Sequence, residues 1–305
     1  MVMKKQRQRS TAVVLKAALI ICICYIYKDH QGDMVTKVND AVKQRNAKSD
    51  ALNTNDPQHA LSDWKPVYVY RGGLSEPPKK LQWNGQVEQD KLVSWLTKNK
   101  TNGYFVDLAA NDASDLSNTL SLEQHLNWTG LCIEANPEYW YRLGRLRSCT
   151  VVGAVVGKNA NEVISFSMDT YMGGIVGNKF DNKRAPKRKT QERFTVQLDR
   201  TFQQFKVPLI IDYLSLDVEG AEESIMNAFP FQDYRFRFMT VERPSANLTA
   251  KLAEHGYQLV KKLVFFGDTL FAHKSELPGI DDIVDHYCKS PSNTKFKYCT
   301  DTATK

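Results

Sequence analysis

Short apolar, β-prone runs alternate with amphipathic segments through most of the chain after residue 89. The runs that predict core strands are 104–107, 131–133, 149–156, 209–217 and 238–242, with weaker ones at 163–168 and 194–198. Helical spacing of apolar residues predicts helices over 89–97, from near Asn118, over 221–228 and over 247–255, which ends at the C-cap Gly256. This alternation predicts an α/β domain with a doubly wound, mostly parallel sheet, and the runs 257–266 and 269–272 predict a final hairpin.

Acidic residues stand where the predicted strands end. Asp107, Glu134, Asp217 and Glu242 each close an apolar run, and Glu219 follows shortly after. Because the carboxyl ends of parallel strands meet at one edge of a sheet, we expect these side chains to converge on a ligand crevice. Glu134, at the end of the second strand, has the position at which an acid holds the ribose hydroxyls of an adenosine.

The loop after the first strand suits a close approach of backbone to ligand. Ala109, Ala110 and Ala113 are small, and the helix that begins near Asn118 directs its positive N-terminal end at the same place. The order strand, loop, helix, strand and acid over residues 104–134 is typical of a nucleotide-type cofactor site.

The N-terminal pattern predicts a membrane anchor. Residues 1–10 carry four basic side chains, and residues 11–27 are apolar except for Lys16. By the positive-inside rule the basic tail stays cytoplasmic and the domain enters the lumen, as in a single-pass type II protein of the endoplasmic reticulum or Golgi apparatus. A short span suits a thin early secretory membrane. The alternative is a cleaved signal peptide, but no small-x-small cleavage site follows Tyr27, so a transmembrane signal-anchor is favoured.

Composition divides the rest of the chain into three parts. Residues 28–65 are polar, cannot bury a core and predict a stem. Residues 66–280 are long enough for one α/β domain, and residues 281–305 are predicted to be a C-terminal tail.

The cysteines and the glycosylation patterns agree with a lumenal address. Cys22 and Cys24 lie in the predicted span; the other four, which allow three pairings, are Cys132, Cys149, Cys288 and Cys299. Proximity favours a disulfide between the last two, whereas Cys132 either pairs with Cys149 or remains a buried thiol. Acceptor triplets for N-glycosylation begin at Asn99, Asn127 and Asn247. No spacing of histidine and cysteine resembles a zinc site.

A basic run over residues 179–193 supplies much of the net charge of +7. It either attracts a sulfated or uronic-acid-bearing glycan or is an ordinary solvated loop. Aromatic residues are not interleaved with it, which argues against a nucleic-acid partner. Gly173 and Gly174 precede it, either as a hinge over the crevice or as an ordinary turn.

Four motifs together resemble the FkbM-like family of S-adenosylmethionine-dependent methyltransferases. They are GQVEQD at 85–90, SNT with LE at 117–123, WTGLCIE at 128–134 and IDYLSLDVEG at 211–220. The resemblance covers residues 83–273 and implies a Rossmann-like class I methyltransferase, here a membrane-anchored member of eukaryotic type, with S-adenosylmethionine as cofactor. Family members usually carry glycine where this chain has Ala109 and Ala113.

These positions give a predicted site. The residues predicted to bind the cofactor are Asp107, Ala109, Asn111, Asn118, Glu134, Ala135, Asn136 and Asp217. Methyl transfer to a hydroxyl requires removal of the acceptor's proton, which a carboxylate achieves when burial or like charge raises its pKa toward neutrality. We predict Asp217 as the general base, with Glu219 and Glu242 as partners.

Two alternatives concern the same acids. They could hold Mg²⁺, which prefers carboxylate oxygen, but this is less favoured and we predict no metal site. In the other alternative, Asp217 and Glu219 cap the helix that begins near Ala221.

Two functions are therefore weighed. The favoured one is a lumenal O-methyltransferase that acts on a sugar hydroxyl of a glycan or glycoconjugate. The alternative is an inactive methyltransferase-fold module that binds secretory cargo, as membrane-anchored relatives resembling the insect protein Star act in trafficking. The acids at the strand ends favour the enzyme, and Ala109 and Ala113 favour the binding module.

Overall fold

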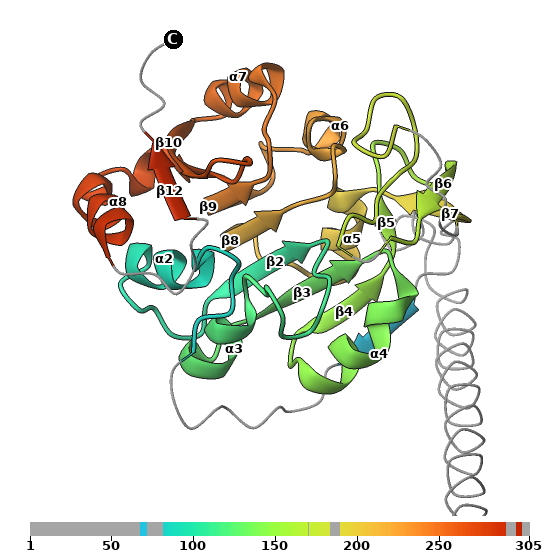
Figure 1. Ribbon diagram of the computed structural model, residues 1–305, viewed down its shortest axis with the longest axis horizontal. Coiled ribbons are helices and arrows are strands. Elements are labelled where there is room, and N and C mark those ends of the chain that lie inside the picture. The colour runs from blue at the N-terminus through green and yellow to red at the C-terminus, as the bar shows by residue number, and fades with distance from the viewer. Residues whose placement is uncertain (1–67, 72–81, 170, 184–189, 291–296, 301–305) are drawn as a thin grey trace, which may run out of the picture. The chain divides into compact units, whose positions relative to one another are not determined.

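The computed structural model describes residues 68–71, 82–169, 171–183, 190–290 and 297–300. These residues form a nine-stranded sheet with the order β1-β4-β3-β2-β8-β9-β11-β10-β12 and a three-stranded sheet with the order β5-β7-β6 (Figure 1). The strands are β1 Tyr68–Arg71, β2 Tyr104–Leu108, β3 Thr129–Glu134, β4 Thr150–Gly153, β5 Val155–Val156, β6 Val163–Ser167, β7 Thr190–Val196, β8 Ile210–Leu216, β9 Arg235–Val241, β10 Tyr257–Val264, β11 Thr269–His273 and β12 Lys297–Thr300.

Five strands in the centre of the large sheet run parallel, namely β4, β3, β2, β8 and β9. Antiparallel pairing adds β1 at one edge and β11, β10 and β12 at the other. The chain builds outward from β2 through β3 and β4, then returns to the other side of β2 with β8 and β9. The strand order therefore reverses between β2 and β8, where open α/β sheets bind their ligands.

Helices cover both faces of this sheet, as predicted for a doubly wound fold (Figure 1). Successive side chains of a strand point to opposite faces, so each central strand supplies two cores. Val106 and Leu214 pack on one face with α5, α6 and α7, and Phe105 and Tyr213 pack on the other with α2, α3, α4 and α8. The helices are α2 Gln89–Leu96, α3 Leu120–Leu126, α4 Pro137–Leu146, α5 Leu198–Gln204, α6 Glu222–Ala228, α7 Ala246–Glu254 and α8 Ile280–Lys289.

The predicted strand over 149–156 is in fact two strands. β4 ends at Gly153, and the amide of Ala154 donates to the carbonyl of Glu134 (3.1 Å). β5 begins at Val155, leaves the large sheet and pairs parallel with β7. The break turns the chain across the carboxyl edge of the large sheet, which a continuous strand could not do.

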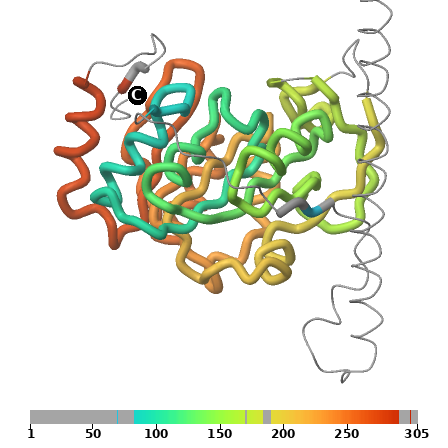
Figure 2. Tube along the Cα trace, turned by 90° about the horizontal axis from the view of Figure 1, so that it is seen from below, coloured from blue at the N-terminus to red at the C-terminus, as the bar shows by residue number. Residues whose placement is uncertain are grey.

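The predicted tail, residues 281–305, is partly built into the domain. α8 lies beside α2 (Figure 2), and the hydroxyl of Tyr287 donates to the carbonyl of Val87. β12 pairs with β10, and the predicted Cys288–Cys299 disulfide joins α8 to this edge strand. Residues 281–290 and 297–300 of the predicted tail are therefore packed onto the domain.

A second disulfide joins Cys132 on β3 to Cys149 just before β4. The sequence left open whether Cys132 is paired or free, and the structure shows the pair. Because β3 and β4 are also neighbours in the sheet, the disulfide and the parallel pairing hold the same two strands together.

Within the described residues, no helix has the length and apolar character required to cross a bilayer. The predicted basic tail, signal-anchor and stem over residues 1–65 lie outside the described part of the chain, and their predictions stay predictions.

Candidate active site

A cavity of about 390 Å³ opens at the carboxyl edge of the large sheet, where β2 and β8 meet. Its volume is within the ~300–1,000 Å³ usual for small-molecule sites. The predicted site residues that line it are Asp107, Ala109, Asn111, Asn118, Glu134, Ala135, Asp217, Glu219 and Glu242. Asn136 does not line it; its side chain instead caps α4 by accepting a hydrogen bond from the amide of Glu138 (3.1 Å).

Glu134 organises the loop that follows β2. Its two oxygens accept hydrogen bonds from the amides of Asn111 (2.7 Å) and Asn136 (2.6 Å). Burial raises the pKa of this carboxyl to about 7 despite these bonds. Each oxygen keeps a further lone pair, so the carboxylate can still accept hydroxyl donors from a ligand.

Ala109 has the left-handed backbone conformation that glycine would adopt at no cost. Its φ is 67°, and that of Asn111 is 52°. A left-handed alanine costs about 1–2 kcal/mol, whereas asparagine tolerates this region better. Ala113 has no such conformation and is fully buried in the core. Of the two departures from the expected glycines, the one at Ala109 is therefore the strained one.

Asn118 directs an unsatisfied acceptor into the cavity. Its Nδ2 donates to the Ser215 hydroxyl (3.1 Å), and its buried Oδ1 has no hydrogen-bond partner. A Cβ at Gly85 would lie 2.9 Å from this oxygen, so glycine there keeps the space open. A buried carbonyl oxygen without a donor is costly, which marks this atom as a contact for a ligand with an N–H group.

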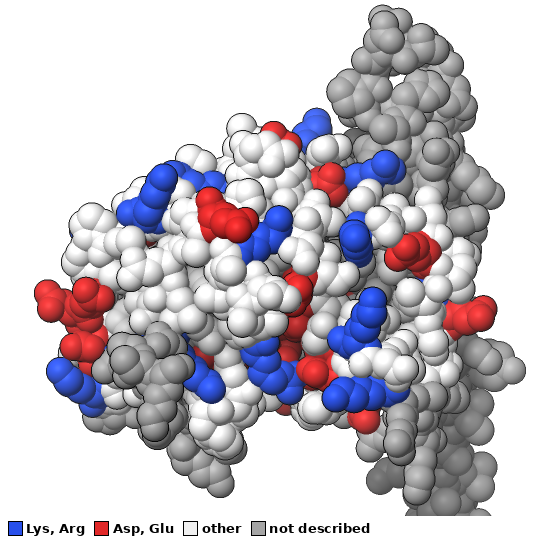
Figure 3. All heavy atoms as spheres, turned by 90° about the horizontal axis from the view of Figure 1, so that it is seen from above, with Lys and Arg blue, Asp and Glu red and all other residues white. Residues whose placement is uncertain are grey.

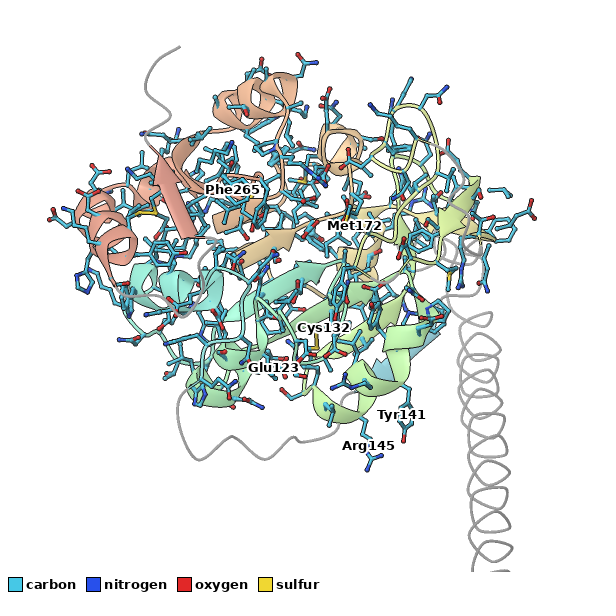
Figure 4. All side chains as sticks on the ribbon, in the orientation of Figure 1. Glu123, Cys132, Tyr141, Arg145, Met172 and Phe265 are labelled. Carbon is cyan, nitrogen blue, oxygen red and sulfur yellow. A yellow bond between two sulfur atoms is a disulfide. The ribbon has the colours of Figure 1, made fainter. Side chains whose placement is uncertain are left out.

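A buried ion pair that the sequence did not reveal supports this loop. Arg147 is fully buried and pairs with Glu123 of α3, which lies close to Cys132 in Figure 4. Its guanidinium also donates to the hydroxyls of Ser117 (3.1 Å) and Thr119 (2.7 Å), the residues on either side of Asn118. No motif marks Arg147, because its partners come from distant parts of the chain.

Asp217 and Glu242 form a hydrogen-bonded carboxyl pair at the ends of β8 and β9. Burial, and then the neighbouring Glu242, raises the pKa of Asp217 well above its usual range. Burial also raises the pKa of Glu242, to about 7. The pair therefore retains a proton at a pH at which two isolated carboxyls would both be ionised.

Arg243 binds three carboxylates beside this pair. Its Nη2 lies 2.6 Å from Asp181 Oδ2, 2.9 Å from Glu219 Oε2 and 2.6 Å from Glu242 Oε2. The amide of Asp181 also donates to the carbonyl of Glu219 (3.1 Å), so the segment 171–183 is attached to the rim of the cavity. The sequence analysis missed Arg243, although it directly follows the predicted acid Glu242.

The predicted capping role of Asp217 and Glu219 is wrong. The N-cap position of α6 is Ala221, and no side chain caps it. Glu222 instead folds back, and its Oε1 accepts hydrogen bonds from the amides of Val218 (3.0 Å) and Gly220 (3.2 Å). Both predicted acids are thereby left to face the cavity.

A comparison with family models matches residues 107–259 to the methyltransferase FkbM domain. The chain belongs to the FkbM methyltransferase family. The match contains most of the cavity lining, from Asp107 on β2 to Arg243 after β9, and leaves out Gln86, Gln89, Phe266 and Asp268. No curated protein matches the chain.

One solved structure that resembles this FkbM methyltransferase is precorrin-6y C5,15-methyltransferase from Geobacter metallireducens GS-15. It is 12% identical, with a TM-score of 0.35, and the likeness covers 65% of this chain and 91% of that one. A likeness this remote carries no argument about the site.

Methyltransferases usually take their methyl group from S-adenosylmethionine, and the cavity of this FkbM member fits that molecule. Its apolar end suits the adenine ring and is formed by Ile133, Val155, Val156, Phe166 and Ile175. Glu134 would accept the ribose hydroxyls, and Asn118 Oδ1 would accept from the ammonium group.

The carboxylates of this FkbM site also come close enough to suggest a cation. Oxygens of Asp181, Glu219 and Glu242 lie within 4.8 Å of one another, as do those of Asp217, Glu222 and Glu242. Arg243, however, already contacts every member of the first group, and Glu222 in the second holds backbone amides. These carboxylates are therefore a poor fit for Mg²⁺.

Proposed function

We propose that this protein is an S-adenosylmethionine-dependent O-methyltransferase that acts on a sugar hydroxyl of a glycan or glycoconjugate. The observation that carries the proposal is the Asp217–Glu242 carboxyl pair, which opens into the same cavity as Glu134 and Asn118. A proton acceptor with a pKa near neutrality thus lies beside a site suited to the methyl donor.

The chemistry needs one proton acceptor. When bound, S-adenosylmethionine supplies an electrophilic methyl group on its sulfonium. The acceptor hydroxyl would lose its proton to a carboxylate of the cavity as it takes up the methyl group. Glu242 is the better acceptor in the pair, because Arg243 lies against it and stabilises its ionised form. We therefore propose Glu242 as the base, in place of Asp217, which the sequence alone suggested.

We place the enzyme in the secretory lumen, held by a single-pass type II anchor. Two disulfides support this location, since they persist in oxidising compartments. The acceptor asparagines Asn99, Asn127 and Asn247 are all exposed, as glycosylation requires. Basic and acidic side chains are interspersed on the face shown in Figure 3, which supports a partner other than nucleic acid.

The cofactor half of the proposal is tested by calorimetry on the full-length protein. We expect S-adenosylmethionine to bind, and Glu134→Ala to weaken binding by about 1–3 kcal/mol, because a charged hydrogen bond to the ribose is lost. Glu254→Ala, at an exposed position on α7, is the matched control and should bind normally. Absence of binding by the folded protein would count against the enzyme.

The competing function is an inactive module that binds secretory cargo. Ala109 is the observation in its favour, because its methyl group lines the cavity from a strained backbone. Retention of cargo binding by a protein that fails to bind S-adenosylmethionine would make this function the better one.

A further inference from the structure

The cavity is lined by far more acids than bases. Among the described residues, Arg243 is the one basic side chain that lines it. The acids are Asp107, Asp115, Glu134, Asp217, Glu219, Glu242 and Asp268. A cavity with low-dielectric walls and an excess of charges of one sign attracts ligands of the opposite sign and repels those of the same sign, whereas the excess charge does not repel an uncharged ligand.

The positive charge of Arg243 is already offset by three carboxylates. One of its terminal nitrogens already contacts Asp181, Glu219 and Glu242 at 2.6–2.9 Å. A sulfate or carboxylate at the remaining N–H groups of Arg243 would compete with three carboxylates that already offset its positive charge. The described basic residues Lys179, Lys183 and Arg193 do not line the cavity, so their charge does not offset the acids at the reaction site.

Burial and crowding already raise the pKa values of several of these acids, among them Glu134 and Glu242, so bound protons neutralise part of the negative charge near pH 7. Glu219 and Glu242 both have raised pKa values, for which burial is the main cause and neighbouring acids a further one. A carboxylate or sulfate brought next to Glu242 would raise its pKa further and keep it protonated. An anionic acceptor would therefore bind less well, and its hydroxyl would find a protonated Glu242 that cannot accept the proton.

The mouth of the cavity offers apolar surface instead. Leu116, Tyr171 and Met172 line the cavity and are 50%, 56% and 54% exposed. Met172 comes from the segment between β6 and β7 and lies beyond the carboxyl ends of the central strands (Figure 4). Exposed apolar groups around a polar crevice are typical of a ligand-binding surface, and here they suit an uncharged ring better than an ionic one.

We propose that the methyl acceptor is an uncharged hydroxyl compound, such as a neutral sugar ring, and that acceptors with a carboxylate or sulfate beside the reacting hydroxyl are excluded. This inference rests on the proposed O-methyltransferase function and narrows its substrate class. In the transfer, the acceptor hydroxyl loses its proton to Glu242, and its oxygen gains the methyl group. The electron pair of the broken carbon–sulfur bond stays on the sulfur.

The test uses the full-length protein, S-adenosylmethionine with a labelled methyl group, and matched acceptors that differ in one carboxylate. The pairs are methyl glucoside with methyl glucuronide and methyl galactoside with methyl galacturonide. We expect the neutral member of each pair to have a kcat/KM at least about tenfold higher at low salt, with the gap closing as salt is added.

Variants then separate local from general charge effects. Asp115 is exposed and lines the cavity, so Asp115→Lys should reduce the preference for the neutral acceptor at least threefold. Asp233, exposed in the turn before β9 at the other end of the sheet, supplies the control Asp233→Lys, which should leave the preference unchanged.

Equal or faster methylation of the uronides would overturn the inference and leave the proposed function intact. If the protein binds S-adenosylmethionine but methylates no member of either pair and no compound of a wider panel of neutral and acidic glycans, the function fails and the inference fails with it.

Discussion

At the scale of single residues, Ala109 has a backbone conformation that its side chain disfavours. Its φ of 67° predicts that Ala109→Gly relieves strain, and the net gain in unfolding free energy should be about 0.5–1 kcal/mol after the entropy cost of glycine. Ala113→Gly is the matched control and should destabilise, because this alanine is buried without such strain. Denaturant unfolding of both variants measures the difference. Equal destabilisation by both would mean that Ala109 is not strained.

Glu242 sets the expected pH dependence of turnover. Its pKa is raised to about 7, mainly by burial, and the group must be ionised to accept a proton. We therefore expect kcat to rise with pH up to about 7 and then level off. Glu242→Gln should lower kcat by about 10²–10⁴-fold and abolish the inflection, with little change in S-adenosylmethionine affinity.

Substitution of Asp217, the partner of Glu242, shows which of the two carboxyls is the base. Asp217→Asn keeps a hydrogen-bond donor for Glu242, so it should lower kcat less and retain an inflection at a shifted pH. If Asp217→Asn is the more damaging substitution and Glu242→Gln keeps the pH profile, the base is Asp217, as the sequence alone suggested.

At the scale of elements, the buried Arg147–Glu123 pair joins the residue after α4 to helix α3 beneath the cofactor loop. Arg147→Met leaves a buried carboxylate without its partner and should cost about 3–5 kcal/mol of unfolding free energy. Adding Glu123→Gln removes that charge and should recover at least about 1 kcal/mol. Arg145→Met is the control at an exposed position of α4, labelled in Figure 4, and should change stability by less than about 0.5 kcal/mol.

The elements that the sequence predicted well are those with a local signal. β2, β3, β8 and β9 are apolar runs, and their order along the chain was enough to predict a doubly wound sheet. The sequence analysis did not predict α4, although Asn136 and Pro137 are a suitable N-cap and first helical residue. α8 and β12 were missed because their burial depends on α2 and β10, which are far away in sequence.

The candidate site likewise has features that the sequence predicts and features that it does not. Strand ends place acids at one edge, so the convergence of Asp107, Glu134, Asp217 and Glu242 was predictable. The raised pKa values of Asp217 and Glu242 were not predictable, because they depend on a contact between the ends of β8 and β9 and on their common burial. The bridging position of Arg243 likewise requires Asp181, which comes from a loop outside the parallel core.

At the scale of the whole molecule, the crowded carboxyls make the stability of the unliganded protein pH-dependent. Glu134 and Glu242 have folded-state pKa values of about 7, raised from 4.5, so between these values the folded state binds more protons than the unfolded state. Stability should therefore fall as pH rises from about 5 through 7, by up to about 1.4 kcal/mol per pH unit for each fully shifted group. Thermal unfolding in buffers of constant ionic strength measures this. Higher stability at pH 8 than at pH 6 would contradict it.

Cofactor binding should change the protonation of the same carboxyl groups. S-adenosylmethionine carries a net positive charge, which lowers the pKa of nearby carboxyls, so its binding at pH 7 should release roughly 0.5–1 proton. S-adenosylhomocysteine lacks the sulfonium charge and should release fewer. Calorimetry in two buffers of different ionisation enthalpy measures the released protons directly, and Glu134→Gln should reduce the number, because that carboxyl is half-protonated at pH 7. Equal proton release by both ligands would mean that the acids of the cavity do not sense the sulfonium, and the electrostatic basis for excluding anionic acceptors would weaken with it.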